Sequence, residues 1–428
     1  MAAEMPGSAS SRLVSTPEKW RLENGLTVLY LPVHQTPVVT TVLSYRVGAA
    51  DEDPEISGAA HFLEHMMFKG SAEFGAGEID RKTQLLGGWN NAFTSHEATV
   101  YVFGFASDRW PVALAIEADR MGGLSLESRE VDSERKVIGE EISMYLDDPW
   151  DSLELEVHRQ LFGDHPYGRP ILGNRESLAR IDSVGLHRFH AAHYRPQNAV
   201  LAVVGDVRRA DLEETVEAHF GAIEGGANHP AAVLTRGRKL SEVLRVERRK
   251  GETARLLLGM PAPAATDADH ARLVVAMTVL GGGRTSRLHR RLVEDLRLCS
   301  RISADATESV GPGLSVIAAE AMPDADPTAI ERVVFEELDH FRGKPPSQPE
   351  LDRARSMLQA DWIFGHERIH QQAMLVATVE TLFDSEYPAR HLRAVRECSR
   401  DDLMRVAQKY LSPSDGAVIG WSLAEGAR

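Results

Sequence analysis

The chain is poor in cysteine. Only Cys299 and Cys398 are present among 428 residues, and they lie far apart in the sequence. Two such cysteines provide neither the disulfide framework of a small secreted protein nor a cysteine-based zinc site. We therefore expect a protein of a reducing compartment and place it in the cytoplasm.

Long apolar segments are missing as well. The sequence has no uninterrupted apolar run of the roughly 20 residues that cross a bilayer. Residues 1–8 lack the basic and apolar regions of a signal peptide and the arginines of a transit peptide. The sequence therefore predicts no membrane span and no targeting segment.

Basic residues are outnumbered by acidic ones. Lys and Arg total 48 against 63 Asp and Glu, which gives a net charge of −15. This balance argues against a nucleic acid as partner. Several acidic residues crowd between positions 140 and 156, and we expect most of them to form a solvated helix face. With 43% apolar residues, the chain is long enough for two domains that each have a core.

Two histidines and a glutamate stand close together in the segment His61-Phe62-Leu63-Glu64-His65. On a helix, His61 and His65 lie on one face because they are four residues apart, and Glu64 leans to the same side. This order, H-x-x-E-H, inverts the H-E-x-x-H of other zinc peptidases. Both orders let two neutral imidazoles bind Zn²⁺ while the glutamate acts as a base towards water. The motif predicts a zinc-dependent hydrolase of amide bonds.

A packed core helix is the alternative explanation of this motif. In such a helix, backbone carbonyls would satisfy His61 and His65. We disfavour it because burying two imidazoles and a carboxylate without a cation is costly. We expect the helix to begin at a cap formed by residues 57–58 and to stop near residues 69–70.

A third metal ligand is expected from the helix predicted over residues 133–145. This helix carries three acids, Glu134, Glu140 and Glu141. Glu134 and Glu141 share one helix face because they are seven residues apart, whereas Glu140 is rotated away by about 100°. Spacing within the helix does not by itself choose the ligand.

The chain is predicted to consist of two similar halves. A helix over residues 186–194 precedes a strand over 199–204, and a helix over 403–410 precedes a strand over 417–421. The second pair follows the first at about half the length of the chain, which indicates a duplicated domain. We expect an N-terminal metal-binding domain at residues 1–226 and a homologous non-catalytic domain at 227–428.

Each half mixes strands with amphipathic helices and has no regular alternation of strand and helix. This pattern favours an α+β fold over a doubly wound one. Residues 90–95 and 98–102 are predicted to form an edge strand and its neighbour, and an edge strand can accept an extended peptide as an additional strand.

Two further patterns resemble a metal site and a phosphate-binding loop, but we do not interpret them as functional sites. On a helix, His187, His190 and His193 do not stay on one face, and no carboxylate follows at the same spacing. We therefore expect a solvated helix there. The segment 281–286 is rich in glycine, but it lacks the lysine and the spacing of a phosphate loop. We expect it to be a turn or a helix start.

From His61 to Glu141 the chain resembles the insulinase/pitrilysin family of zinc peptidases with the inverted motif. The similarity continues almost end to end, and includes residues 23–26, 88–94 and 165–170. It is most similar to the half-length, two-domain members, which include the catalytic subunit of mitochondrial processing peptidase. Several matches in the right order are much stronger evidence than one motif.

The resemblance implies roles for individual residues. In the family the third ligand is a glutamate on a later helix, at a spacing from the second histidine that falls on Glu141. A second acid two helical turns earlier supports the metal site, and this position is Glu134. Asn91 and Ala92 match residues that face the backbone of the substrate. The resemblance also implies one Zn²⁺ per chain and two homologous domains, each a mostly antiparallel sheet with helices packed on it.

The resemblance further implies a partner. In the family a second two-domain half closes the catalytic chamber around the peptide substrate and supplies an Arg and a Tyr. Here Val293 and Ser300 stand at these positions, and neither replaces the missing groups, although Arg291 or Arg297 could substitute from a shifted register. We therefore expect a heterodimer with a zinc-less homologous subunit that carries the Arg/Tyr pair.

A non-catalytic structural or peptide-binding subunit of a larger complex is the alternative function. Relatives that serve as scaffolds have lost the metal motif, whereas this chain keeps every element of it. The sequence therefore favours an enzyme.

Overall fold

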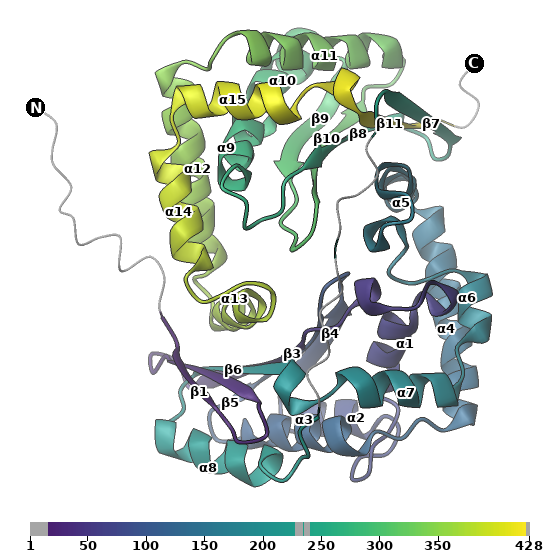
Figure 1. Cartoon of the computed structure of the whole chain (residues 1–428), viewed down its shortest axis with the longest axis vertical. Coiled ribbons are helices and arrows are strands. Elements are labelled where there is room, and N and C mark those ends of the chain that lie inside the picture. Colours follow the sequence, from purple (N-terminus) through teal and green to yellow (C-terminus); the bar gives the residue numbers. More distant parts are fainter. Residues whose placement is uncertain (1–15, 227–233, 235–239, 425–428) are drawn as a thin grey trace, which may run out of the picture. The chain divides into compact units, whose positions relative to one another are not determined.

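The computed structural model describes residues 16–226, 234 and 240–424 (Figure 1). The chain divides into two compact units. The first comprises residues 1–142, 170–232 and 363–388, and the second comprises 143–169, 233–362 and 389–428. No helix among the described residues is both long and apolar enough to cross a membrane.

The first unit is built on a six-stranded sheet with the order β1-β2-β6-β3-β5-β4. Its strands are β1 Glu18–Arg21, β2 Thr27–Pro32, β3 Val38–Tyr45, β4 Trp89–Thr94, β5 Thr99–Ala106 and β6 Ala199–Gly205. Neighbouring strands are antiparallel except for β2 and β6, which are parallel. Strand β4 is the edge that the sequence predicts.

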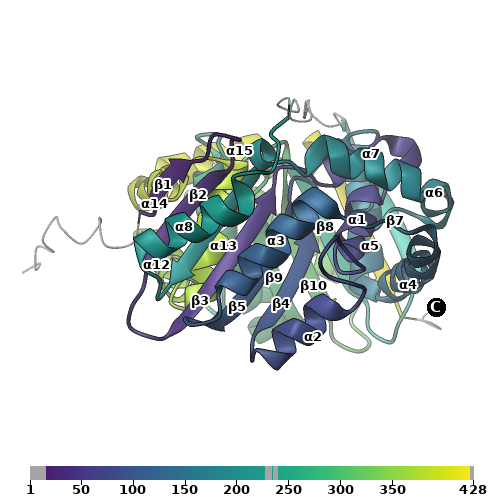
Figure 2. The same ribbon diagram turned by 90° about the horizontal axis from the view of Figure 1, so that it is seen from below.

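Helices cover both faces of this sheet. The helices of this unit are α1 Ala59–Met66, α2 Glu78–Leu85, α3 Pro111–Gly123, α4 Ser128–Asp147 up to residue 142, α6 Arg175–Arg180, α7 Ser183–His193, α8 Arg209–Phe220 and α13 Ile369–Leu382. Helices α3 and α8 lie across one face (Figure 2). On the other face, α13 packs its small apolar residues Ala373, Val376 and Ala377 against buried side chains of the sheet.

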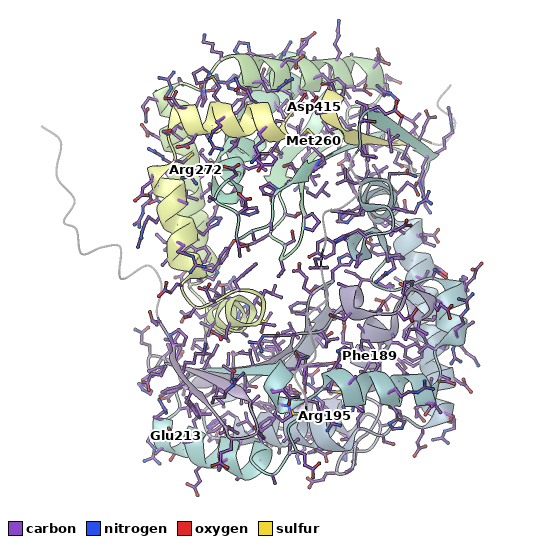
Figure 3. All side chains as sticks on the ribbon, in the orientation of Figure 1. Phe189, Arg195, Glu213, Met260, Arg272 and Asp415 are labelled. Atoms are coloured by element: carbon purple, nitrogen blue, oxygen red, sulfur yellow. The ribbon has the colours of Figure 1, made fainter. Side chains whose placement is uncertain are left out.

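The second unit is built on a five-stranded sheet with the order β7-β11-β8-β10-β9. Its strands are β7 Val243–Arg249, β8 Arg255–Ala262, β9 Cys299–Ala306, β10 Gly313–Ala321 and β11 Ala417–Leu423. Its helices are α5 Pro149–Phe162, α9 His270–Gly281, α10 Arg287–His289, the π-helix η6 Arg290–Asp295, α11 Pro327–Gly343, α12 Gln348–Gly365, α14 Tyr387–Glu397 and α15 Arg400–Tyr410. The fully buried Met260 of β8 belongs to the core of this unit (Figure 3).

Helix α5 packs closely on the second sheet because two glycines make room for it. A Cβ atom at Gly259 would lie 2.7 Å from Cγ1 of Val157, and one at Gly420 would lie 2.7 Å from Cδ1 of Leu153. Any larger residue at these two sheet positions would push the helix away.

Five strands of the first sheet, all except β1, have the same topology as the five strands of the second sheet. In the second unit, β7 and β11 form the parallel pair, as β2 and β6 do in the first, and the remaining pairs are antiparallel in the same succession. The α+β fold with two homologous, mostly antiparallel sheets is therefore confirmed.

Each half of the chain contributes one helix to the unit of the other half. Helix α5, which precedes residue 226, belongs to the second unit, and α13, which follows it, belongs to the first. The compact units therefore differ from the two contiguous stretches that the sequence suggests, and the expected join lies largely outside the described residues. A local sequence pattern does not show this exchange because α5 and α13 are ordinary amphipathic helices.

We expect residues 1–226 to fail to fold when they are produced alone. Without α13, the apolar face of the first sheet, which includes Leu29, Val42 and Val102, would be open to water. The expected result is an aggregated product without a cooperative thermal transition, measured by size-exclusion chromatography and circular dichroism. The matched control is the same stretch with residues 363–388 joined to it through a flexible linker, which should restore a cooperative transition. A soluble, cooperatively unfolding 1–226 fragment would contradict this expectation.

Candidate metal centre

Helix α1 is held firmly at its N-terminus. Gly58 caps it with φ 97°, a left-handed conformation that favours glycine, and a Cβ atom there would lie 2.6 Å from the carbonyl oxygen of Leu172. The buried Glu52 carboxylate accepts hydrogen bonds from the backbone N–H groups of Gly58 and Ala60, each at 2.8 Å. These contacts satisfy N–H groups at the start of the helix and place a negative charge at the positive end of its dipole.

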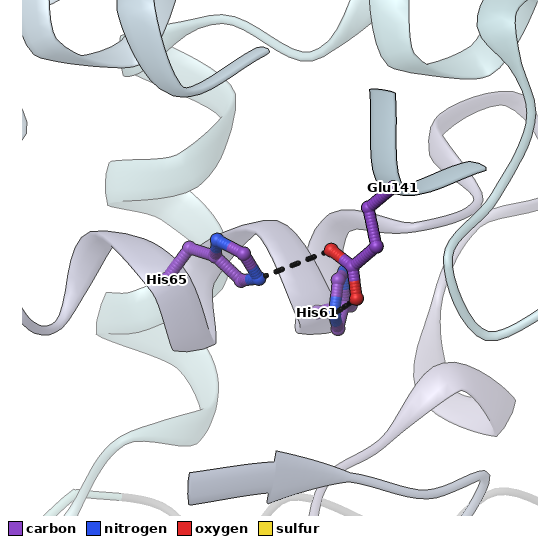
Figure 4. A group of neighbouring side chains, drawn as sticks. All are labelled: His61, His65 and Glu141. Carbon is purple, nitrogen blue, oxygen red and sulfur yellow. Dashed lines mark ion pairs between the residues drawn. The ribbon is translucent and has the colours of Figure 1, made fainter. Parts of the chain in front are cut away.

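Three potential metal ligands converge between α1 and α4. The ligand atoms of His61, His65 and Glu141 all lie within 4.8 Å of one another (Figure 4). Nε2 of His61 is 3.6 Å from one oxygen of Glu141, and Nε2 of His65 is 3.4 Å from the other. The structure thus brings together the three residues predicted as ligands.

Glu134 holds His65 from the opposite side of its ring. Oε1 of Glu134 accepts a hydrogen bond from Nδ1 of His65 at 2.9 Å, and its Oε2 lies 2.7 Å from Nζ of Lys69. Burial raises the pKa of Glu134, but the hydrogen bonds from His65 and Lys69 outweigh burial and lower it. Because Nδ1 keeps its proton in the bond to Glu134, Nε2 is the ring atom that would offer a lone pair to a cation once its own proton is displaced.

The phase of α4 agrees with the sequence prediction. Glu134 is buried and Glu141 is partly buried, whereas Glu140 is exposed. The pKa of Glu141 is lowered, mainly by its hydrogen bond with His65. Glu141 is therefore ionised at neutral pH, the form in which a carboxylate binds a cation.

The pKa values of the two histidines are shifted in opposite directions, although burial lowers both. Burial, helped by the nearby His65, lowers the pKa of His61 to about 4, so His61 is neutral near pH 7. Burial also lowers the pKa of His65, but its hydrogen bonds with Glu134 and Glu141 outweigh burial and raise the pKa to about 9. A cation at this cluster would therefore displace a proton from His65.

Glu64 lies on the same helix as the two histidines but belongs to no ligand set. Its side chain is 8% exposed, and burial raises its pKa despite a hydrogen bond from Thr94. The hydroxyl of Thr94 donates to Oε2 of Glu64 at 2.6 Å. Glu64 is thus a buried carboxylate, next to a cluster of potential cation ligands, with a proton affinity higher than usual.

The donor set fits a zinc ion. Two imidazole nitrogens and one carboxylate are the three protein ligands of one group of catalytic zinc sites, in which the fourth position stays open. The Nδ1 atom of His61 is buried and, among the described residues, has no hydrogen-bond partner, so the ring is not explained as a satisfied core histidine. This observation counts against the packed-helix explanation of the motif.

Strand β4 places Asn91 and Ala92 on the open edge of the first sheet. Its residues alternate between exposed and partly buried, and β4 pairs with β5 on one side. Asn91 is exposed, whereas Ala92 packs against the main core. The edge position is confirmed, while contact of these two residues with a substrate stays a prediction.

The second unit shows the surroundings of the residues at the Arg and Tyr positions. Val293 lies in η6 and packs against the core, and the Ser300 hydroxyl donates to the carbonyl oxygen of Glu320 at 3.3 Å. Arg291 is engaged in ion pairs with Glu336 and Glu337. Arg297 is exposed and has a positive φ of 52°.

The histidines of α7 are less solvated than the sequence suggests. His187 is exposed, but Nε2 of His190 bonds to the carbonyl oxygen of Arg120 at 3.1 Å, and His193 is buried against Phe189. The expectation of a solvated helix was therefore wrong for two of the three, because α7 packs one side on the core. The metal-ligand geometry found in the described residues includes none of them. As expected, residues 282–286 form a turn between α9 and α10.

Sequence reasoning missed three residues that support the cluster: Glu52, Lys69 and Thr94. A spacing could have pointed to Lys69, which stands one helical turn after His65. Thr94 ends the segment 88–94, which resembles the family, but the sequence assigned no role to it. Nothing local pointed to Glu52, which shares no helix with the groups that it holds.

Comparison with known proteins gives a consistent result for both halves of the chain. Residues 27–175 match the family described as Insulinase (Peptidase family M16), and residues 183–358 match the Peptidase M16 inactive domain. An uncharacterized zinc protease of Streptomyces coelicolor is 30% identical over 404 residues, covering 93% of this chain and 88% of that protein. The zinc protease PqqE of Helicobacter pylori is 27% identical over 407 residues, or 94% of this chain and 92% of that protein.

Solved structures share the fold. The crystal structure of a protease from Helicobacter pylori has a TM-score of 0.90 at 26% identity, covering 96% of this chain and all of that one (100%). The periplasmic protease PqqL of Escherichia coli is 19% identical with a TM-score of 0.77, and the match covers 99% of this chain and 48% of that one. The two family matches, together with the sequence match to the Streptomyces protein over most of both chains, show that this chain belongs to the insulinase family, peptidase family M16.

Proposed function

We propose that this protein is a zinc-dependent metalloendopeptidase that binds one Zn²⁺ per chain. The observation that carries the proposal is the convergence of His61, His65 and Glu141 within 4.8 Å, with the buried Glu64 on the same helix. Relatives named as zinc proteases are the independent support. These residues provide ligands and a base, the minimum set for hydrolysis of an amide at a metal.

Each residue of the site has a separate role in the proposed reaction. A bound Zn²⁺ supplies Lewis-acid polarisation of the scissile carbonyl. Glu64 takes the proton of the attacking water and passes it to the leaving amine, a double role suited to a carboxylate whose pKa is raised by burial. Glu134, bonded to Nδ1 of His65, keeps this imidazole in the tautomer and orientation in which Nε2 binds the cation.

The proposed substrate is a peptide or an unfolded segment in extended conformation. The open edge of β4 offers backbone N–H and C=O groups for pairing with such a segment. Asn91 and Ala92 would then contact the backbone of the substrate. Backbone pairing accepts many sequences, which suits an endopeptidase of broad substrate range.

The proposed active form is a heterodimer that encloses the substrate in a chamber. Val293 and Ser300 occupy the positions at which the resemblance places an Arg and a Tyr, and neither supplies a guanidinium or a phenol. Arg291, a possible replacement, is tied to Glu336 and Glu337. A zinc-less homologue that carries the Arg/Tyr pair would supply the missing groups.

A non-catalytic structural or peptide-binding subunit is the second candidate. The specific observation in its favour is the match of residues 183–358 to the Peptidase M16 inactive domain. This candidate shares peptide binding with the first but excludes turnover, so a cleavage assay separates the two.

The test is digestion of a peptide library by the purified chain, alone and with its zinc-less homologue, with cleavage products identified by mass spectrometry. We expect little cleavage by the chain alone, strong cleavage by the pair, loss of cleavage on chelation and recovery on adding Zn²⁺. Full activity of the chain alone would overturn the heterodimer. A zinc-loaded pair that binds peptides without cleaving them would favour the second candidate.

Cytoplasmic residence is part of the proposal. Cys299 and Cys398 are both free and buried, a state compatible with a reducing compartment. Cell fractionation with an antibody against the chain tests it, and recovery in an extracytoplasmic fraction would exclude it.

A further inference from the structure

The carboxylate of Glu64 is held by one side chain from a different element. The hydroxyl of Thr94, the last residue of β4, donates a hydrogen bond to Oε2 of Glu64 at 2.6 Å. Among the described residues, no other hydrogen bond to the Glu64 side chain is found. A short bond to a buried carboxylate is charge-assisted and directional, so it restricts the rotation of the carboxylate.

The position of Thr94 is set by the tight turn that follows it. Thr94 pairs with Thr99 across the hairpin. Within the turn, the hydroxyl oxygen of Ser95 accepts hydrogen bonds from the backbone N–H groups of Glu97 at 3.1 Å and Ala98 at 3.0 Å. The hydroxyl of Thr94 therefore projects from a backbone with little freedom to move.

A second segment locks the same turn from outside. The backbone N–H of Ala49 donates to the carbonyl oxygen of Ser95 at 3.0 Å, and that of Ala50 donates to the carbonyl oxygen of His96 at 2.8 Å. This approach needs a glycine at position 48, where a Cβ atom would lie 2.4 Å from the carbonyl oxygen of Ser95. The turn that follows Thr94 is thus held both by its own hydrogen bonds and by those from Ala49 and Ala50.

We propose that Thr94 is the positioning residue of the catalytic base. It holds Oε2 of Glu64 and thereby keeps Oε1 available for the proton of the attacking water. In the reaction, Glu64 takes a proton from water as the C–O bond forms, and then passes it to the nitrogen as the C–N bond breaks, while Thr94 keeps its own proton throughout. The inference rests on the proposed peptidase function.

Thr94 connects the proposed catalytic base to the strand proposed to bind the substrate. Thr94 lies on the strand that carries Asn91 and Ala92, which are proposed to align the substrate. One edge strand then determines both the register of the peptide and the orientation of the base. Such shared support keeps the reacting groups within the small positional tolerance that catalysis requires.

The experiment compares three variants in the active assembly of this chain and its partner. Thr94→Val keeps the shape of the side chain and removes the hydroxyl, whereas Thr94→Ser keeps the hydroxyl. Thr41→Val is the matched control, because Thr41 is buried in the same sheet and its hydroxyl has no hydrogen-bond partner among the described residues. Steady-state kinetics, zinc content and thermal unfolding are measured for each.

We expect Thr94→Val to lower kcat by about 10- to 100-fold, the range typical of losing a partner that orients a reactive group. KM and zinc content should stay within twofold of the wild type, Thr94→Ser should recover most of kcat, and Thr41→Val should match the wild type. Unchanged kcat in Thr94→Val, an effect on KM alone or loss of zinc would overturn the inference. If the wild-type assembly cleaves no peptide, the proposed function fails and the inference falls with it, whereas an active wild type with a fully active Thr94→Val refutes the inference only.

Discussion

Glu64→Gln is expected to abolish peptide cleavage and to leave zinc binding intact. The amide of Gln has nearly the shape of the carboxylate but accepts no proton at neutral pH, so water is no longer deprotonated. Removal of a general base lowers turnover by about 100- to 10,000-fold. Zinc should remain at one ion per chain because the proposed ligands, His61, His65 and Glu141, are unchanged. Cleavage kinetics and metal analysis by mass spectrometry measure the two effects separately.

The control is a second glutamate that also precedes a proposed ligand in the sequence but is exposed to solvent. Glu140 is exposed on α4, next in sequence to a proposed ligand, and Glu140→Gln should retain both zinc and activity. If Glu64→Gln turned over peptide at the wild-type rate, Glu64 would not be the base. If it lost its zinc, the carboxylate would belong to the metal site instead of acting on water.

Glu141→Gln is expected to empty the metal site. Gln is a neutral and weaker ligand, and its side-chain amide cannot balance the charge of a divalent cation. We expect zinc affinity to fall by more than about 100-fold, beyond the range for losing an outer hydrogen-bond partner. Titration with a fluorescent zinc chelator measures the affinity, and cleavage should be lost in parallel.

Two comparisons make this prediction specific. His61→Ala and His65→Ala should have the same effect on zinc as Glu141→Gln, because each removes one of the three converging groups. Glu140→Gln should leave zinc affinity unchanged. An empty site in Glu140→Gln together with a loaded site in Glu141→Gln would mean that α4 presents its other face to α1.

The centre of the site was predictable because its residues depend on helical periodicity. Residues four apart share a face of any α-helix, so His61 and His65 were expected to point to one place before the fold was known. The same rule paired Glu134 with Glu141 and turned Glu140 outward. The family resemblance was still needed to choose Glu141, since periodicity alone is equally satisfied by Glu134.

The support of the site was not predictable because it crosses between elements. Thr94 lies on a strand and Glu64 on a helix, and their hydrogen bond exists only because β4 packs beside α1. Glu52 reaches the start of α1 from the segment that precedes it. Side chains of this kind are common polar residues, and no periodic pattern distinguishes them from solvated ones.

The sequence alone determined the class of fold, the duplication and the two histidine ligands, because each is expressed in local patterns: strand and helix periodicity, a repeated order of elements, and a motif within one helical turn. The tertiary structure alone decided which unit each helix joins. An amphipathic helix such as α5 or α13 needs an apolar face to cover, and in the two units that face belongs to strands encoded in the other half of the chain. Which unit a helix joins depends on the packing energy between segments that are distant in the sequence, and local sequence patterns do not contain this information.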